Sequence, residues 1–256
     1  MSVRLYKVEF TIIGDVEIAG PINFRTVKEL QPGDIFDSEI TIENHPSGLR
    51  ISCTVFTSSQ DRAYKVGLIF VGRMLDVLSM KIDIRLVVYN NDFKTVIERN
   101  TAKAIINQEE FRRCFDLSRT LNANEPVFLT GLSWYRKGLY TDDSLDKFLA
   151  FWNSISIVCG KYHTRDVGTA KGIKNQIYNC FVTLWGNDIQ FWPLINGDGQ
   201  WINSNNSIRD NIAHGLIPVE ITSIETVIDK LSQVREVAHL FLTKWGNEQF
   251  KVNYRF

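Results

Sequence analysis

A short polar stretch near the end of the chain, NSNNSIRDNIAHGL at residues 203–216, contains Arg209, Asp210, Asn211 and His214 within six positions. A histidine side chain changes charge near neutral pH and can exchange a proton during a reaction. A guanidinium group binds phosphate oxygens through paired hydrogen bonds and stabilises negative charge that develops on them. A carboxylate beside a histidine can orient its ring. These residue types suit proton transfer next to a phosphate group, without a metal ion.

The spacing predicts that these residues share one short helix. Ser207 followed three residues later by Asp210 is typical of a capping box at a helix N-terminus. Gly215 is typical of a left-handed helix stop, and Pro218 prevents the helix from resuming. The helix would therefore have about two turns.

Two interpretations of this helix differ in what the polar side chains do. Asp210 and His214 would lie one turn apart on one face, and Arg209 about 140° around the axis from His214. In the functional interpretation, the long arginine leans toward a point shared with the other two groups. In the structural interpretation, Asp210 caps the helix, Arg209 pairs with a surface carboxylate, and His214 covers the helix end, where a cation is favoured.

The elements around this helix begin with strands. Apolar and polar residues alternate from Tyr6 to Ile12, which is the two-residue period of a half-buried strand. In SEITIENHPSGLRISCTVF, residues 38–56, two alternating runs flank the turn NHPSG and predict a hairpin. Residues 61–79 then change to helical spacing, and DIRLVVYN, residues 83–90, predicts one more strand.

From about residue 107 onward, almost all patterns are helical. Asn107 with Glu110 forms a capping-box pattern for a helix that ends near residue 121, and Asn124 and Pro126 begin the next helix. Further apolar stripes predict helices at residues 144–162, at 173–185 and from Thr222 to 245. The residues expected in the bundle core are Phe148, Trp152, Ile155, Leu231 and Phe241.

These patterns predict an α+β fold. A small antiparallel β-rich domain would span residues 1–100, with one helix near 61–79, and an all-α helical bundle would span residues 101–256. The segment HTRDVGTAKGIK, residues 163–174, lies within the bundle and contains two glycines and two lysines. It lacks the glycine–lysine spacing of a phosphate-binding loop and the preceding strand, so we expect a plain connector.

Composition and charge limit the class of protein. The 256 residues are 44% apolar and 23% charged, which is typical of a globular protein with a core of ordinary size. The 29 basic and 29 acidic residues balance, which argues against broad coating of duplex DNA but permits a local basic pocket.

The cysteines and the apolar runs point to a cytosolic protein. The four cysteines have no CxxC spacing, which predicts buried thiols in a reducing compartment and no zinc site: Cys53, Cys114, Cys159 and Cys180. The N-terminal sequence MSVRLYKVEF does not have the pattern of a signal peptide, and no stretch reaches the roughly 20 apolar residues of a membrane span. We therefore expect a cytoplasmic location and no membrane partner.

The six residues 209–214 match the pattern Arg-x4-His with a polar residue directly after the arginine. This pattern resembles the signature of HEPN domains, which are helical bundles that include many metal-independent ribonucleases. The continuation AHG, residues 213–215, resembles ApeA-like HEPN proteins and the methylamine-utilisation J-type proteins. The stretch LSWYRKGLYTDDSLDKFLAFWNSISI, residues 132–157, also resembles their bundle helices, and the similarity spans roughly residues 61–245. One departure is that Ser154 and Ser156 stand where the resemblance predicts an acidic residue.

The resemblance implies cleavage of RNA through its own 2′-hydroxyl, leaving a 2′,3′-cyclic phosphate and a 5′-hydroxyl. His214 would exchange the proton, Arg209 would stabilise the charged phosphorane, Asp210 would orient the ring, and Asn211 would contact RNA or a partner chain. Neither a metal ion nor another cofactor is expected. Because one helix supplies a single arginine and a single histidine, the expected assembly is a homodimer in which two such helices face each other.

The resemblance further implies a role in bacterial or mobile-element antiviral defence, as a toxin-like nuclease. The substrate would be RNA, with tRNA as one candidate, and an antitoxin or a trigger protein would be a further partner of the β-rich domain. Two alternatives remain open at the level of sequence. One is a non-catalytic HEPN module for binding or assembly, and the other is an accessory protein of methylamine utilisation.

Overall fold

The computed structural model describes residues 4–31, 34–89, 103–141, 143–217 and 221–250, with the side chains at 27–31, 34–37, 61, 221 and 222 left out of the description. The chain divides into two compact units, Met1–Arg119 and Thr120–Phe256. The division falls inside helix α2 (Gln108–Asn124). The domain boundary at residue 100 remains a sequence-based prediction.

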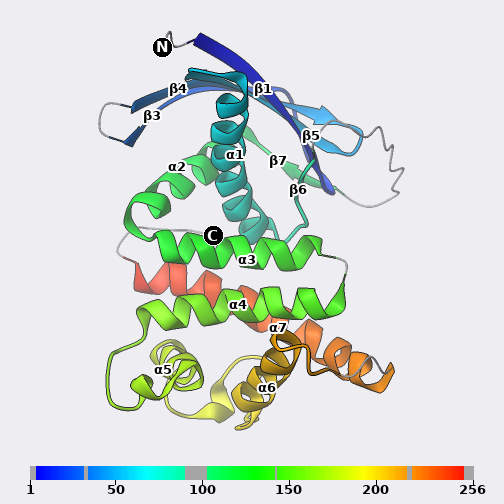
Figure 1. Ribbon diagram of the computed structural model, residues 1–256, viewed down its shortest axis with the longest axis vertical. Coiled ribbons are helices and arrows are strands. Elements are labelled where there is room, and N and C mark those ends of the chain that lie inside the picture. The colour runs from blue at the N-terminus through cyan, green and yellow to red at the C-terminus, as the bar shows by residue number, and fades with distance from the viewer. Residues whose placement is uncertain (1–3, 32–33, 90–102, 142, 218–220, 251–256) are drawn as a thin grey trace. The chain divides into compact units, whose positions relative to one another are not determined.

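The first unit is built on a five-stranded antiparallel sheet with strand order β3-β4-β5-β1-β6 (Figure 1). The strands of this sheet are β1 (Arg4–Ile13), β3 (Ile22–Gln31), β4 (Asp34–His45), β5 (Gly48–Thr57) and β6 (Val87–Tyr89). The short strands β2 (Val16–Ile18) and β7 (Ala104–Ile106) form a separate parallel pair. The antiparallel β-rich N-terminal part and the β4–β5 hairpin predicted from sequence are thereby confirmed, with His45 paired to Gly48 across the turn.

One face of this sheet forms the core of the first unit. Val8 pairs with Cys53 and Phe10 with Ile51, so that alternate residues of β1 and β5 point to the same side and are buried. Helix α1 (Gln60–Ile82) packs against β1 and β5, and the added Cβ of Gly67 would lie only 2.9 Å from Val8. The Ser59 side chain accepts a hydrogen bond from the Arg62 amide and begins this helix.

The second unit is helical. Besides the last part of α2, it contains α3 (Pro126–Tyr140), α4 (Ser144–Tyr162), α5 (Ile173–Trp185), α6 (Trp201–Ala213) and α7 (Ile221–Gln249), with 3-10 turns η1 (Thr169–Lys171) and η2 (Ile189–Phe191). Helix α4 packs against α3 and α7 and, on another side, against α5 and α6 (Figure 1). The α+β fold class is confirmed at this level.

Four of the five predicted core residues of this unit are completely buried: Phe148, Trp152, Ile155 and Phe241. The prediction for Leu231 is wrong, since this side chain is partly exposed. The apolar period of α7 begins before the part of the helix that other elements cover, and Ile228 is 47% exposed. Periodicity therefore identified the correct face of α7 but overestimated the buried length.

The N-termini of α2 and α3 agree with the capping residues predicted from sequence, except at one position. The Asn107 side chain accepts from the Glu110 amide at 2.9 Å, and the Glu110 carboxylate accepts from the Asn107 amide at 3.2 Å, which confirms the capping box. Pro126 is the first residue of α3, as predicted. The N-cap of α3 is Glu125 rather than Asn124, because Asn124 is the last residue of α2.

We expect Gly138→Ala to destabilise the second unit. Its Cβ would lie 2.6–2.8 Å from the Phe151 ring in a fully packed site, so the free energy of unfolding should fall by about 1–3 kcal/mol. The matched control is Gly160→Ala, where the Cβ meets its nearest neighbours at 3.7–3.9 Å and the higher helix propensity of alanine should add roughly 0.5 kcal/mol. Urea unfolding curves test both, and equal effects of the two substitutions would contradict the packing described.

The four free cysteines are all buried, as predicted. Burial raises the pKa of Cys53 to about 12 and that of Cys114 to about 12, and it also raises the pKa of Cys159. At pH 8 the thiolate, which is the reactive form, is therefore suppressed in the native state.

We expect almost no labelling by a thiol-exchange reagent in native buffer and four reactive thiols in denaturant. Rapid labelling of the native protein would refute this.

Candidate active site

The helix that carries the candidate residues is longer than the sequence indicated. Helix α6 begins at Trp201, so Ser207 lies in its middle and the predicted capping box of Ser207 with Asp210 is wrong. The residue in the N-cap position, Gln200, makes no capping hydrogen bond through its side chain. Tertiary packing of Trp201, which is 1% exposed, overrides the weak helix propensity of the asparagine-rich segment that follows.

Trp201 anchors the beginning of α6. Its ring centroid lies 5.5 Å from that of Trp152 on α4 and 6.1 Å from that of Phe181 on α5. The indole Nε1 donates a hydrogen bond to the Gln233 side chain on α7 at 3.0 Å. Gln233 in turn donates to the carbonyl oxygen of Leu194 at 2.6 Å. One tryptophan thus connects α6 to three other helices of the unit.

Two consecutive asparagines follow on the buried side of the helix. Asn205 is fully buried and donates from Nδ2 to the Trp201 carbonyl at 2.8 Å. Asn206 is 7% exposed and donates from Nδ2 to the Asp210 carboxylate at 2.9 Å. Among the described residues, the side-chain oxygens of both asparagines and the Trp152 indole N–H have no hydrogen-bond partner. Burying these polar atoms without hydrogen bonds lowers the stability of the folded state at α6.

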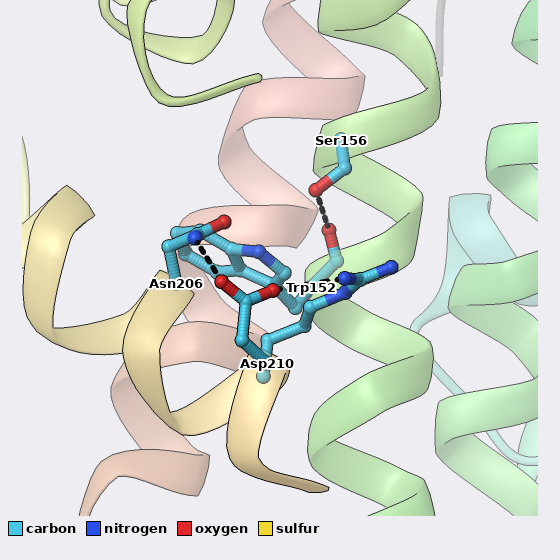
Figure 2. A network of polar contacts seen from close by, with 5 residues as sticks. Trp152, Ser156, Asn206 and Asp210 are labelled. Carbon is cyan, nitrogen blue, oxygen red and sulfur yellow. Dashed lines mark hydrogen bonds and ion pairs between the residues drawn. The ribbon is translucent and has the colours of Figure 1, made fainter. Parts of the chain in front are cut away.

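The candidate residues follow one turn later. Figure 2 shows Asn206 on α6 reaching the Asp210 carboxylate, beside the α4 segment that carries Trp152 and Ser156. The other carboxylate oxygen of Asp210 accepts from Arg209 Nη1 at 2.9 Å, and the two side chains are 39% and 46% exposed. Asp210 therefore joins a buried amide to a guanidinium that reaches solvent.

His214 lies at the C-terminal end of α6. Its amide N–H donates to the Asp210 carbonyl, its side chain is exposed, and in the described part of the chain its ring has no hydrogen-bond partner. Gly215 has a left-handed φ of 65°, which confirms the predicted stop. The amides of Gly215 and Leu216 donate to the carbonyls of Ile212 and Asn211, which completes a Schellman motif. Pro218 lies outside the described residues.

The structure therefore brings the predicted residues together, but the hydrogen bonds between them differ from those expected. Arg209, Asp210, exposed Asn211 and His214 share the last turns of one helix, as expected. No hydrogen bond in the described residues joins Asp210 to the His214 ring, because Asp210 binds Arg209 and Asn206 instead. The serines at the position of the expected carboxylate, Ser154 and Ser156, donate to backbone carbonyls of their own helix.

Sequence reasoning missed Trp201, Asn206 and Gln233. A helix start at Trp201 would have placed Asn206 and Asp210 one turn apart, the spacing at which such side chains bond. Asp198 and Gly199 before Trp201 form a turn in which the Trp201 amide donates to the Asp198 carbonyl. That Asp-Gly pair was the local indication of the true start.

The segment 163–174 is a connector without the geometry of a phosphate loop. The amides of Thr169 and Ala170 donate to Asp166, and those of Lys171 and Gly172 donate to the carbonyls of Gly168 and Thr169. These amides are occupied internally, so they do not form the open cradle that a phosphate loop needs. This agrees with the sequence-based expectation of a connector.

Comparisons with protein-family models, with curated proteins and with solved structures found no match to this chain. Among the described residues, no helix is long and apolar enough to cross a membrane. Within the same residues, no group of three or more histidine, cysteine, aspartate or glutamate side chains is arranged to hold a metal ion.

We expect Gln233→Ala to loosen α6. It leaves the buried Trp201 N–H and the Leu194 carbonyl without a partner, so the free energy of unfolding should fall by about 1–3 kcal/mol. The control is the neighbouring Ser232→Ala, an exposed hydroxyl whose loss should change stability by less than about 0.5 kcal/mol. Urea midpoints and hydrogen exchange of the Trp201 indole N–H test the difference. Unchanged indole exchange in Gln233→Ala would contradict this anchoring.

Proposed function

We propose that this chain is a metal-independent endoribonuclease of the HEPN type that acts as a homodimer. His214 exchanges the proton of the RNA 2′-hydroxyl or of the leaving oxygen, and Arg209 stabilises the charged phosphorane. The observation that carries the proposal is the exposed His214 ring at the end of the helix that also presents the Arg209 guanidinium. The products are a 2′,3′-cyclic phosphate and a 5′-hydroxyl.

The state of the two side chains supports these roles. The His214 ring makes no hydrogen bond within the described residues, so both ring nitrogens are open to a substrate. The guanidinium of Arg209 has five N–H donors, and among the described residues only Nη1 is engaged, with Asp210. Arg209 is therefore held in place while it keeps donors for phosphate oxygens, which makes Asp210 a positioning residue for the arginine.

Exposed apolar side chains directly after α6 and in the first part of α7 support the dimer. Leu216 is 66% exposed directly after the helix, and Ile228 on α7 is 47% exposed. Ile224 and Leu231, on the same helix, are partly exposed. A two-fold contact through this region covers these side chains and gives one assembly two arginines and two histidines.

The broader proposal is a cytoplasmic toxin-like nuclease of bacterial or mobile-element defence, acting on RNA such as tRNA. The N-terminal unit then senses a trigger or binds an antitoxin. A second candidate is a non-catalytic HEPN binding or assembly module. One observation favours it: Asp210 accepts hydrogen bonds from both Arg209 and Asn206. Bonds of this kind would also be expected if these residues only stabilised α6.

We expect His214→Ala and Arg209→Ala each to reduce RNA cleavage by roughly 10²–10⁴-fold, because they remove proton transfer and charge stabilisation respectively. Asp210→Asn should cost less, since the single amide oxygen still accepts a hydrogen bond from Arg209, and the new NH2 group can donate to the Asn206 side-chain oxygen, which has no partner among the described residues. The measurement is the cleavage rate of end-labelled RNA, including tRNA, and the chemical identity of the new ends. Chelator should have no effect, and a 2′-deoxy substitution at the cut site should abolish cleavage.

The control for this experiment is Asn203→Ala, an exposed position of the same helix far from its C-terminal end. Thermal melts of all variants separate loss of chemistry from loss of fold, and solution scattering reports the oligomeric state. Cleavage that survives His214→Ala, requires magnesium or acts equally on DNA would overturn the mechanism. Loss of the dimer in these variants, with no cleavage by the parent protein, would select the assembly module.

A further inference from the structure

The connector between α4 and α5 concentrates positive charge. Residues 160–180 contain four lysines or arginines and one acidic residue, although the whole chain has 29 of each sign. All four cations are exposed, and none has an ion pair or a side-chain hydrogen bond in the described part of the chain: Lys161, Arg165, Lys171 and Lys174. This is a local excess of unpaired positive charge on a protein of zero net charge.

The single acidic side chain of this segment shapes the turn. The Asp166 carboxylate accepts a hydrogen bond from the Thr169 amide at 2.8 Å, which holds the pKa of that carboxyl below its usual range. The Thr169 hydroxyl donates to the Thr164 carbonyl and accepts from the Asp166 amide, and Thr169 is 3% exposed. Asp166 is thus occupied by the backbone, and the segment has a defined conformation.

The four cations belong to one continuous region. The Thr164 amide donates to the Asn179 side chain at 2.9 Å, which fixes the neighbouring Arg165 beside α5. The end of α4 also meets the start of α5, because a Cβ on Gly160 would lie 3.9 Å from Ile173. Lys161 follows directly in sequence. The cations of the connector and those at the start of α5 are therefore neighbours.

An exposed aromatic ring adjoins the cations, and a second exposed ring follows next to the residue that supports it. Tyr178 is 42% exposed and lies one helical turn after Lys174 on the exposed face of α5. Its ring centroid is 5.4 Å from that of buried Trp192, which supports the ring from behind. The residue before Trp192, Phe191, is 77% exposed. Two exposed rings therefore lie next to Trp192, Phe191 in the sequence and Tyr178 in the fold, and Tyr178 lies a helical turn from Lys174.

We propose that this connector surface, formed by Lys161, Arg165, Lys171, Lys174, Tyr178 and Phe191, binds a single-stranded segment of RNA. The cations bind consecutive phosphates, and the rings stack on unpaired bases, which is the combination that single-stranded nucleic acid requires. A duplex offers its phosphates but keeps its bases stacked inside, so it leaves the rings unused. The choice of RNA over DNA rests on the proposed function, whereas the site itself rests on charge and exposure.

The test is equilibrium binding of the full chain to a fluorescent 2′-O-methyl oligonucleotide of about 15 nucleotides, which cannot be cleaved by attack of a 2′-hydroxyl. We expect Lys171→Glu with Lys174→Glu to weaken binding roughly tenfold or more and to reduce the salt slope by about 1.4, because two phosphate contacts are lost. Tyr178→Ala with Phe191→Ala should weaken binding roughly fivefold or more and leave the salt slope unchanged.

The matched control is Lys137→Glu with Lys147→Glu, which changes the net charge by the same amount in the same unit. Lys147 lies near the start of α4, roughly 20 Å along the helix from Lys161, and Lys137 on α3 lies over the Trp134 ring. The control should retain binding within about twofold. Equal losses in both charge reversals, or equally tight binding of duplex DNA, would overturn the proposal.

Two further measurements distinguish failure of the binding site from failure of the nuclease. Vesicles with anionic headgroups should bind more weakly than the oligonucleotide, and vesicle binding without oligonucleotide binding would overturn the proposal in favour of a membrane surface. Oligonucleotide binding that depends on the connector surface, in a protein that cleaves no RNA, would uphold the site and reject the nuclease. Cleavage that is unaffected by the connector variants would uphold the nuclease and reject the site.

Discussion

The burial of Trp201 is the interaction on which the candidate site depends. Removing a ring of this size from water is worth roughly 4–6 kcal/mol as an upper estimate. The buried side-chain oxygens of Asn205 and Asn206, which have no partner among the described residues, cost about 1–3 kcal/mol each. The two terms are of the same size, so α6 would not hold this position without its tryptophan and the hydrogen bond to Gln233.

This balance explains why a polar helix can lie against an apolar bundle. Trp201 fixes the first turn of α6 against α4 and α5, and the remaining residues then follow the helical period. Asn206 comes to lie on the buried side, one turn before Asp210, and Arg209 and His214 come to lie where solvent reaches them. The positions of the polar groups are thus a consequence of one apolar contact about one to four turns before them. Polar groups that are retained at such a cost are often functional.

The sequence predicted those features that depend on local chemistry. The bounds of α5, the Asn107–Glu110 capping box and the left-handed Gly215 each rest on neighbouring residues, and the structure contains all three. The start of α6 and the exposure of Leu231 depend on which other helices cover a segment, and periodicity does not contain that information. For the candidate site, the shared helix end could be predicted. The bonds of Asp210 could not, because they depend on a helix start that tertiary packing determines.

Charge is distributed differently on the sheet of the first unit and on the connector between α4 and α5, and this decides how far each charge acts. On the sheet of the first unit, opposite charges meet: Lys7 lies 3.1 Å from Glu9, lowering the pKa of that carboxyl, and Glu43 stands opposite Arg50 in the β4–β5 register. The electric fields of two such opposite charges cancel within a few ångströms. The cations of the connector have no such partners in the described structure, so their field extends over the Debye length of about 8 Å at physiological ionic strength. With zero net charge there is no long-range attraction to add to it, so a polyanion would feel this surface only at short range. The proposed binding surface would therefore favour a flexible strand, which can follow a small charged patch, over a rigid duplex, which needs a longer one.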